Sequence, residues 1–241
     1  MLATVDLDAL DPLGRARVDV LRGEIAFDQI RADEAAPLLV EAARRLEPVD
    51  VGLARRTYLE ALGAAMFQGD TDGPSGLRAI ARAALLAPTS DGAPTAIDAL
   101  LDAFALRFTE GHRQAAPVLR RALDLVRAPG PTADDHGHWM SFAVSSNAIT
   151  LTQELWDAEA WRTLAARQVQ FSRDTGAIVQ LQFGLSMLAW VAVLAGELGH
   201  ATQLLDYPQT IAVATGNGAV WFPEFRVAAA RGDDHGARTR I

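Results

Sequence analysis

The sequence repeats a unit of two amphipathic segments with helical periodicity. The clearest copy covers residues 51–69, where the apolar side chains step by three, four or six positions and therefore fall on one face of a helix. Similar endings recur at residues 103–111 and 188–196, and an Ala/Leu-rich segment follows each of them. A pair of helices that cannot bury its apolar face alone stacks against neighbouring pairs. The sequence therefore predicts a solenoid of helical hairpins.

The composition supports a helical fold. Alanine and leucine dominate the apolar residues, aromatic residues make up only 7% of the chain, and no alternating strand pattern bounded by turn residues occurs. We expect an all-α protein, a tetratricopeptide-like right-handed helical-hairpin solenoid of about 11–12 helices. The most irregular stretch is residues 128–137. It predicts one continuous solenoid in two helical-repeat halves, 1–130 and 131–241.

Several residues mark helix ends. Asp11, Asp50 and Asp157 stand where an N-cap is expected, and a proline follows Asp11 at the first helical position. Three glycines lie about twenty residues apart at predicted helix ends, where a left-handed C-cap favours glycine: Gly176, Gly196 and Gly216. Pro208 falls inside a predicted helix, and we expect a kink or a break there because proline removes a helical hydrogen bond.

Charge and missing residue types exclude several functions. The net charge is −8, whereas a duplex-DNA binder needs a basic surface to displace counterions from phosphates. The arginine pairs 44–45, 55–56 and 120–121 have acidic neighbours, and we expect them on solvated helix faces. The chain has no cysteine, and all 22 basic residues are arginine. Thiolate chemistry, Schiff-base catalysis and a P-loop lysine are therefore excluded. We expect no direct nucleic-acid binding and no cofactor.

The sequence shows no targeting or membrane segment. Its first eight residues are acidic rather than basic and then apolar, and the longest apolar stretch, 185–195, is too short to span a bilayer. We expect a cytoplasmic protein that does not enter a membrane.

Segments along nearly the whole chain, from about residue 7 to 232, carry a family signature. They are residues 21–27, 36–48, 53–62, 106–111, 115–122, 156–161, 165–169 and 212–217. Together they resemble large actinobacterial LuxR-family transcriptional regulators, specifically the tetratricopeptide-like middle region between an ATPase domain and a C-terminal helix-turn-helix. The chain has neither a P-loop nor a helix-turn-helix, so the resemblance implies neither ATP hydrolysis nor DNA binding.

The resemblance implies a free-standing sensor region of such a regulator. The residues after Gly232 carry no polar capping repeat. We therefore expect that the last helix can bury its apolar face against a second copy, in a homodimer.

An aromatic pocket in the second half is a candidate site. Tryptophan at helical spacing is typical of a core, and the alternative is an aromatic-lined pocket between helices that also carries a few polar groups. The candidate ligand-binding residues are Phe142, Asn147, Gln180, Phe183, Trp190, Trp221 and Phe222. Glu224, close to two of these aromatic residues, is the candidate acid or base.

A metal site is not predicted. His136 and His138 could meet one ion, but no third fixed ligand can be identified, and an exposed polar loop is the interpretation we favour.

Two functions remain open. The first is a binding module that recognises a small molecule or a protein partner in the regulation of an actinobacterial secondary-metabolite pathway. The alternative is a stand-alone, cofactor-independent cyclase or isomerase of natural-product biosynthesis, because such reactions can run on shape, desolvation and one acid or base.

Overall fold

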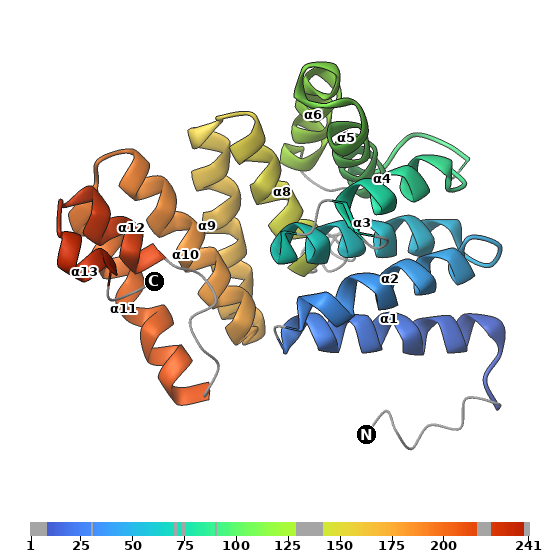
Figure 1. The fold of residues 1–241 in the computed structure, drawn as a ribbon, viewed down its shortest axis with the longest axis horizontal. Helices are drawn as coiled ribbons and strands as arrows, with labels where there is room; N and C mark the ends of the chain where they lie inside the picture. The colour runs from blue at the N-terminus through green and yellow to red at the C-terminus, as the bar shows by residue number, and fades with distance from the viewer. Residues whose placement is uncertain are drawn as a thin grey trace. The chain divides into compact units, whose positions relative to one another are not determined.

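The computed structural model describes the backbone of residues 9–29, 31–69, 72–73, 76–89, 91–128, 142–215 and 223–238. Within these residues the regular structure is entirely helical, so the expected all-α fold is confirmed. Twelve helices follow one another along this part of the chain (Figure 1). They are α1 (Pro12–Asp28), α2 (Ala32–Leu46), α3 (Val51–Gln68), α4 (Leu77–Leu86), α5 (Ala96–Glu110), α6 (His112–Arg127), α8 (Phe142–Glu154), α9 (Ala158–Thr175), α10 (Ile178–Leu194), α11 (Leu198–Thr215), α12 (Pro223–Ala230) and α13 (Asp234–Arg238).

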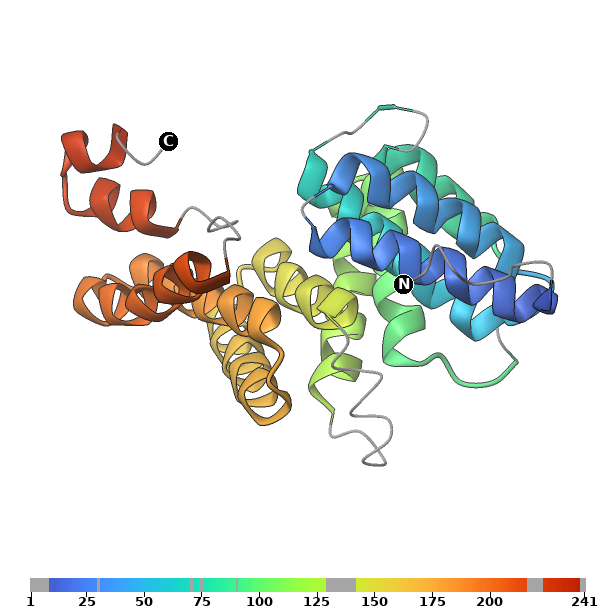
Figure 2. The same cartoon turned by 90° about the horizontal axis from the view of Figure 1, so that it is seen from below.

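The chain forms two compact units, residues 1–151 and 152–241, which divide within α8. In the first unit each helix from α1 to α6 packs against the next, and α3 also packs against α5 (Figures 1 and 2). In the second unit each helix from α9 to α13 packs against the next, and α10 also packs against α12. The irregular segment where we expected the two halves to meet lies, beyond Ala128, outside the described residues.

Aspartate side chains cap the N-termini of three helices, α1, α3 and α9. Asp11 accepts a hydrogen bond from the Gly14 N–H at 2.6 Å, and Asp50 accepts one from the Leu53 N–H at 2.9 Å. Asp157 accepts one from the Ala160 N–H at 2.9 Å. These three predicted N-caps are therefore confirmed.

Glycine ends two of the described helices. Gly176 closes α9 with φ 71°, as the sequence predicts, and Gly69 closes α3 with φ 76°. Both values lie in the left-handed region, which glycine enters without a steric penalty. Gly216, the third glycine of the predicted series, lies outside the described residues.

Helix α2 packs against both α1 and α3. Its inner face is largely alanine, and the fully buried members are Ala35, Ala36, Ala42 and Ala43. Leu39 lies against Gly23 of α1, where an added Cβ would come within 2.6 Å of the leucine side chain. Small residues on both helices therefore let α1 approach α2 closely.

Two details of the second unit bear on the predicted helices. Helix α11 continues through Pro208 to Thr215, so the helix does not break at the proline, and a kink there stays a prediction. The short helix α13 was not predicted, because a five-residue segment is too short to show helical periodicity. Among the described helices, none combines the length and apolarity that a membrane crossing requires.

Candidate functional site

A cavity of about 690 Å³ opens in the first unit between α1, α3 and the first turn of α5. Its apolar wall consists of Val20, Leu21, Leu53 and Ile97. Its polar wall consists of Arg17, Glu24, Asp50, Arg56, Thr95 and Asp98, and Gly52 also lines it. This combination of an apolar wall with a few charged groups is typical of small-molecule sites, and so is the volume.

Helical spacing brings the lining side chains of one helix to the same side. The lining residues of α1 are Arg17, Val20, Leu21 and Glu24. They are separated by three, one and three positions, so they share one face of the helix. On α3, Gly52, Leu53 and Arg56 share a face for the same reason. The first turn of α5 closes the cavity, and its position depends on the contacts made by Asp98.

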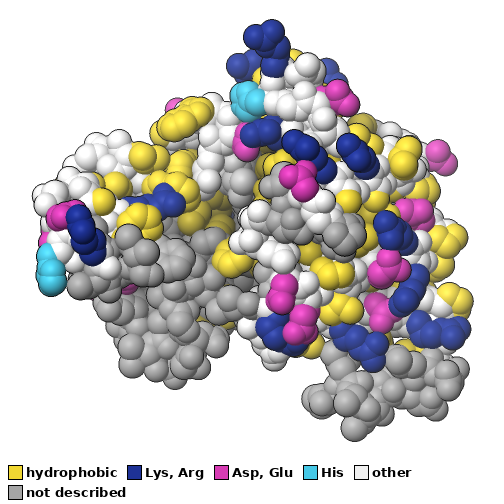
Figure 3. Space-filling model, viewed as in Figure 1, with side chains coloured by type: hydrophobic (Ala, Val, Ile, Leu, Met, Phe, Trp, Pro, Cys, Tyr) yellow, Lys and Arg dark blue, Asp and Glu magenta, His cyan; other side chains and the backbone are white. Residues whose placement is uncertain are grey.

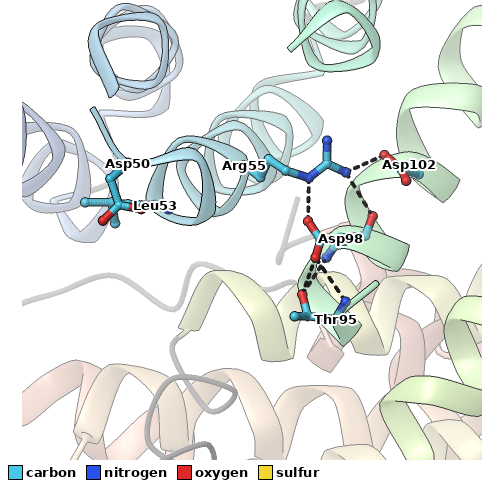
Figure 4. Close-up of polar contacts among 6 residues, drawn as sticks. All are labelled: Asp50, Leu53, Arg55, Thr95, Asp98 and Asp102. Carbon is cyan, nitrogen blue, oxygen red and sulfur yellow. Dashed lines mark hydrogen bonds and ion pairs between the residues drawn. The ribbon is translucent and has the colours of Figure 1, made fainter. Parts of the chain in front are cut away.

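Asp98 joins α5 to α3 through a buried arginine (Figure 4). Arg55 of α3 is only 1% exposed, and its Nε donates to Asp98 Oδ1. Its Nη2 donates to Asp102 Oδ1, one turn further along α5, at 2.5 Å. The expectation that the arginine pair 55–56 lies on a solvated face is therefore wrong for Arg55.

The Asp98 carboxylate also caps the N-terminus of α5, the helix to which it belongs. Asp98 Oδ2 accepts from the Thr95 N–H at 3.0 Å and from the Thr95 hydroxyl at 2.7 Å, while Thr95 Oγ1 accepts from the Asp98 N–H, which completes a capping box. Burial alone would raise the pKa of Asp98, but the hydrogen bonds from Thr95 and Arg55 outweigh it and hold the pKa below its usual value. Burial lowers the pKa of Arg55, and the two aspartates more than compensate and raise it.

Glu60 is a buried carboxyl one turn beyond the cavity-lining Arg56. Its side chain is 4% exposed, and its Oε1 accepts from Arg56 Nε at 3.0 Å. Its Oε2 has no hydrogen-bond partner among the described residues. Burial raises the pKa of Glu60 to about 7; Arg56 opposes this rise, and the charge of Glu24 on α1 adds to it.

The structure places the candidate residues of the predicted aromatic pocket in different surroundings. Asn147 is buried in α8, and its Nδ2 donates to the carbonyl oxygen of Leu59 in α3 at 3.2 Å. The Phe142 side chain, Trp221 and Phe222 lie outside the described residues, as do His136 and His138.

Three other candidates lie on α10 in the second unit. Gln180 accepts a hydrogen bond from Gln168 Nε2 at 3.1 Å, and Phe183 is buried. Trp190 packs edge-on against Trp161, with ring centroids 5.2 Å apart.

Trp190 also makes a cation–π contact. Arg226 of α12 lies over the Trp190 ring, with its Cζ 3.4 Å from the ring centroid, and burial lowers the pKa of Arg226. Glu224, the predicted acid or base, lies on the same helix and is half-buried. Helix α12 packs against α10, the helix that carries Trp190.

The surface carries charges of both signs. Basic and acidic side chains are interspersed over the face of the first unit that Figure 3 shows. Exposed ion pairs such as Arg44–Glu41 at 2.7 Å occur on the surface of this unit. The arginine pairs 44–45 and 120–121 are exposed, as expected. Within the described part of the chain, no group of three acidic or histidine side chains is placed to hold a metal ion.

The sequence indicates the buried polar residues of the first unit only weakly. Thr95 and Asp98 have the spacing of a capping box, and Asp98 and Asp102 share one helical face. Two carboxylates on one face call for a basic partner, but nothing in the sequence shows that Arg55 supplies it. Comparison of the chain with models of protein families, with curated proteins and with solved structures found no match.

Proposed function

We propose that this protein is a helical-repeat binding module that holds a small molecule in the cavity between α1, α3 and α5. The main observation that supports this proposal is the cavity itself, with its volume of about 690 Å³ and its mixed apolar and charged wall. The cavity lies within one unit and is lined by alternate helices. This supports a tetratricopeptide-like solenoid, in which the first helices of successive pairs line one binding face.

The resemblance to LuxR-family regulators supports a role in regulating an actinobacterial secondary-metabolite pathway. In that role the module acts as a sensor, and ligand binding changes its contact with a protein partner. The second unit and its exposed apolar residues, such as Trp156 and Leu194, offer surface for such a partner.

The test is retention of small molecules from an extract of the source organism, measured by mass spectrometry on the purified protein. We expect a compound to remain bound to the natural protein and to be lost from Ile97→Trp, which fills the cavity. Leu86→Trp is the matched control, because Leu86 is 86% exposed and does not line the cavity. Equal retention by Ile97→Trp would place the ligand elsewhere, and no retention at all would reject the small-molecule function.

A second function, a cofactor-independent cyclase or isomerase, is favoured by one observation. The pKa of Glu60, about 7, suits proton transfer near neutral pH. Glu60 does not line the cavity, but it is bonded to Arg56, which does, so such a reaction needs Arg56 to move. Conversion of an extract compound by the natural protein and not by Glu60→Gln would support the enzyme, whereas retention without conversion supports the binding module.

A further inference from the structure

Three turns between helices of the second unit share one hydrogen-bond pattern. In the turn between α8 and α9, the Trp156 N–H donates to the carbonyl three residues before it at 3.1 Å, and the Asp157 N–H donates to the carbonyl five residues before it at 3.0 Å. The turns at Gly196 and Gly232 repeat both bonds, at 3.0 and 2.9 Å. This pair of bonds is the Schellman motif, in which the residue after the C-cap adopts the left-handed conformation. Trp156 therefore occupies the position that glycine occupies in the other two turns.

Trp156 is strained in this position. Its φ is 54°, whereas Gly196 and Gly232 have φ values of 77° and 72°. Among the described residues, no other residue except glycine has a positive φ. The left-handed conformation brings the Cβ of an L-residue close to the following carbonyl oxygen, and glycine avoids this contact because it has no Cβ. A glycine at position 156 would therefore fit the turn better than the tryptophan does.

Burial does not compensate for this strain. Trp156 is 87% exposed. An added Cβ at Gly196 or Gly232 would meet no atom within 4 Å, so a side chain at this place in the turn points away from the fold. Backbone strain of this kind is typical of residues that serve binding, and an exposed tryptophan offers a partner a large apolar surface.

The charges beside Trp156 in the chain are negative. Glu154, Asp157 and Glu159 lie within three positions of it, and no basic residue does. Asp157 caps α9 through the Ala160 N–H at 2.9 Å, which holds its carboxylate at the turn. A nucleic acid or another acidic surface would be repelled from this turn, whereas a basic surface would be attracted to it.

The turn between α10 and α11 lies at the same end of the unit as the turn at Trp156 (Figure 1). Arg162 of α9 donates from its two terminal nitrogens to the two carboxylate oxygens of Glu197 in that turn, at 3.1 Å each. This pair joins the start of α9 to the second turn, and the two charges offset each other. Leu194, the last residue of α10, is 57% exposed. We call Trp156, Leu194 and the carboxylates of residues 154, 157 and 159 the turn surface.

We propose that the turn surface binds a protein partner whose own surface carries basic residues around an apolar pocket, and that the Trp156 side chain fills that pocket. Tryptophan is enriched among the few residues that carry most of the binding energy of protein interfaces. A second copy of this chain fits less well, because a two-fold contact would bring the same acidic residues against one another. This inference rests on the proposed function, because it names the chemistry of the protein partner of that module.

The first measurement separates binding from stability. Trp156→Gly removes the strain, so its thermal unfolding midpoint should lie about 1–4 °C above that of the natural protein. Gly196→Ala is the matched control, because it adds a Cβ in the same conformation at the corresponding turn and should lower the midpoint by a similar amount. A midpoint of Trp156→Gly at or below that of the natural protein would mean that the indole supports the fold, and it would overturn the proposal.

The second measurement identifies the partner. The immobilised full chain is exposed to those proteins of the source organism's extract that a cation-exchange resin retains, and the bound proteins are identified by mass spectrometry. The expected partner, once purified, binds Trp156→Gly about tenfold or more weakly than the natural protein in calorimetric titration, and its affinity falls as the salt concentration rises. Leu86→Ala, which changes an equally exposed apolar residue of the first unit, should leave the affinity unchanged.

The charge of the turn surface is tested on the same complex. Glu159→Lys should weaken binding by about three- to tenfold, whereas Glu41→Lys, which changes an exposed glutamate of α2, should not. A captured protein that binds Trp156→Gly as tightly as the natural chain, or capture of no protein at all, would overturn the proposal. Dimerisation of the natural chain that Trp156→Gly abolishes would identify a second copy as the occupant and would also overturn it. None of these results touches small-molecule binding, which depends on retention of an extract compound and its loss in Ile97→Trp.

Discussion

Asp98 of α5 holds Arg55 of α3 and caps its own helix with one carboxylate. Both roles need an oxygen acceptor, and the guanidinium favours one that carries a negative charge. The cavity wall formed by the first turn of α5 therefore depends on one side chain.

We expect Asp98→Ala to lower the free energy of unfolding by about 2–4 kcal/mol, because it removes one charge-assisted hydrogen bond of the buried Arg55 and half of the capping box, while Asp102 still holds the guanidinium. Thr95→Ala removes only part of the cap and should cost about 1 kcal/mol. Asp102 is half-exposed, and Asp102→Ala should cost less than about 1 kcal/mol. Urea unfolding monitored by circular dichroism gives all three values. An equal loss in the three variants would contradict a central role for Asp98.

Glu60 should make stability fall as the pH rises. Its pKa is about 7 in the folded protein, against 4.5 for an unperturbed glutamate, so the folded state binds the proton more tightly than the unfolded chain. This contribution is fully present below pH 4.5 and is lost as the pH rises through 7, by up to about 3 kcal/mol. Glu60→Gln should remove this part of the pH dependence and be the more stable protein at pH 8.

The control for this measurement is Glu41→Gln, which removes an exposed carboxylate from α2. Thermal unfolding at a series of pH values compares the two variants with the natural protein. If Glu60→Gln and the natural protein lost stability in parallel between pH 5 and pH 8, Glu60 would not be the titrating group.

The contact between Asn147 and Gly63 should appear as a coupling energy. A Cβ at Gly63 would lie 3.1 Å from Asn147 Nδ2, the atom that donates to the Leu59 carbonyl. Gly63→Ala gains about 1 kcal/mol of helix propensity, and we expect this gain in full only in an Asn147→Ala background. A double-mutant cycle measured by urea unfolding gives the coupling. Equal effects of Gly63→Ala in both backgrounds would mean that the two residues do not interact.

The cation–π contact of the second unit should contribute measurably. Arg226→Met removes the guanidinium over Trp190 and should lower the free energy of unfolding by about 0.5–2 kcal/mol, with a change in tryptophan fluorescence. Arg238→Met removes an exposed arginine from α13 and should change neither property. A fluorescence spectrum that Arg226→Met leaves unaltered would place the arginine away from the ring.

The sequence predicted the helices better than the site. Caps such as Asp50 and Asp157 are local signals, since each acts on a backbone N–H three residues away. The helix through Pro208 shows the limit of such rules, because tertiary packing can keep a helix continuous through a proline.

The cavity could not be predicted, because it depends on contacts between residues that are far apart in the sequence. Arg55 and Asp98 are separated by 43 positions, and Arg55 and Arg56 look alike in the sequence although one is buried and the other lines the cavity. Tryptophans are large and apolar, so their positions indicate a core or a pocket. The charged groups of the first unit give no such signal, since charged residues on helices usually face water.

The alanines of α2 have a consequence for how such a cavity can change. Because α2 packs against both α1 and α3, its side-chain size sets the spacing of the two helices that form the walls. Replacing Ala36 or Ala43 with valine would push these walls apart without altering any residue that lines the cavity. The size of this cavity can therefore change through substitutions in α2, none of whose residues lines it.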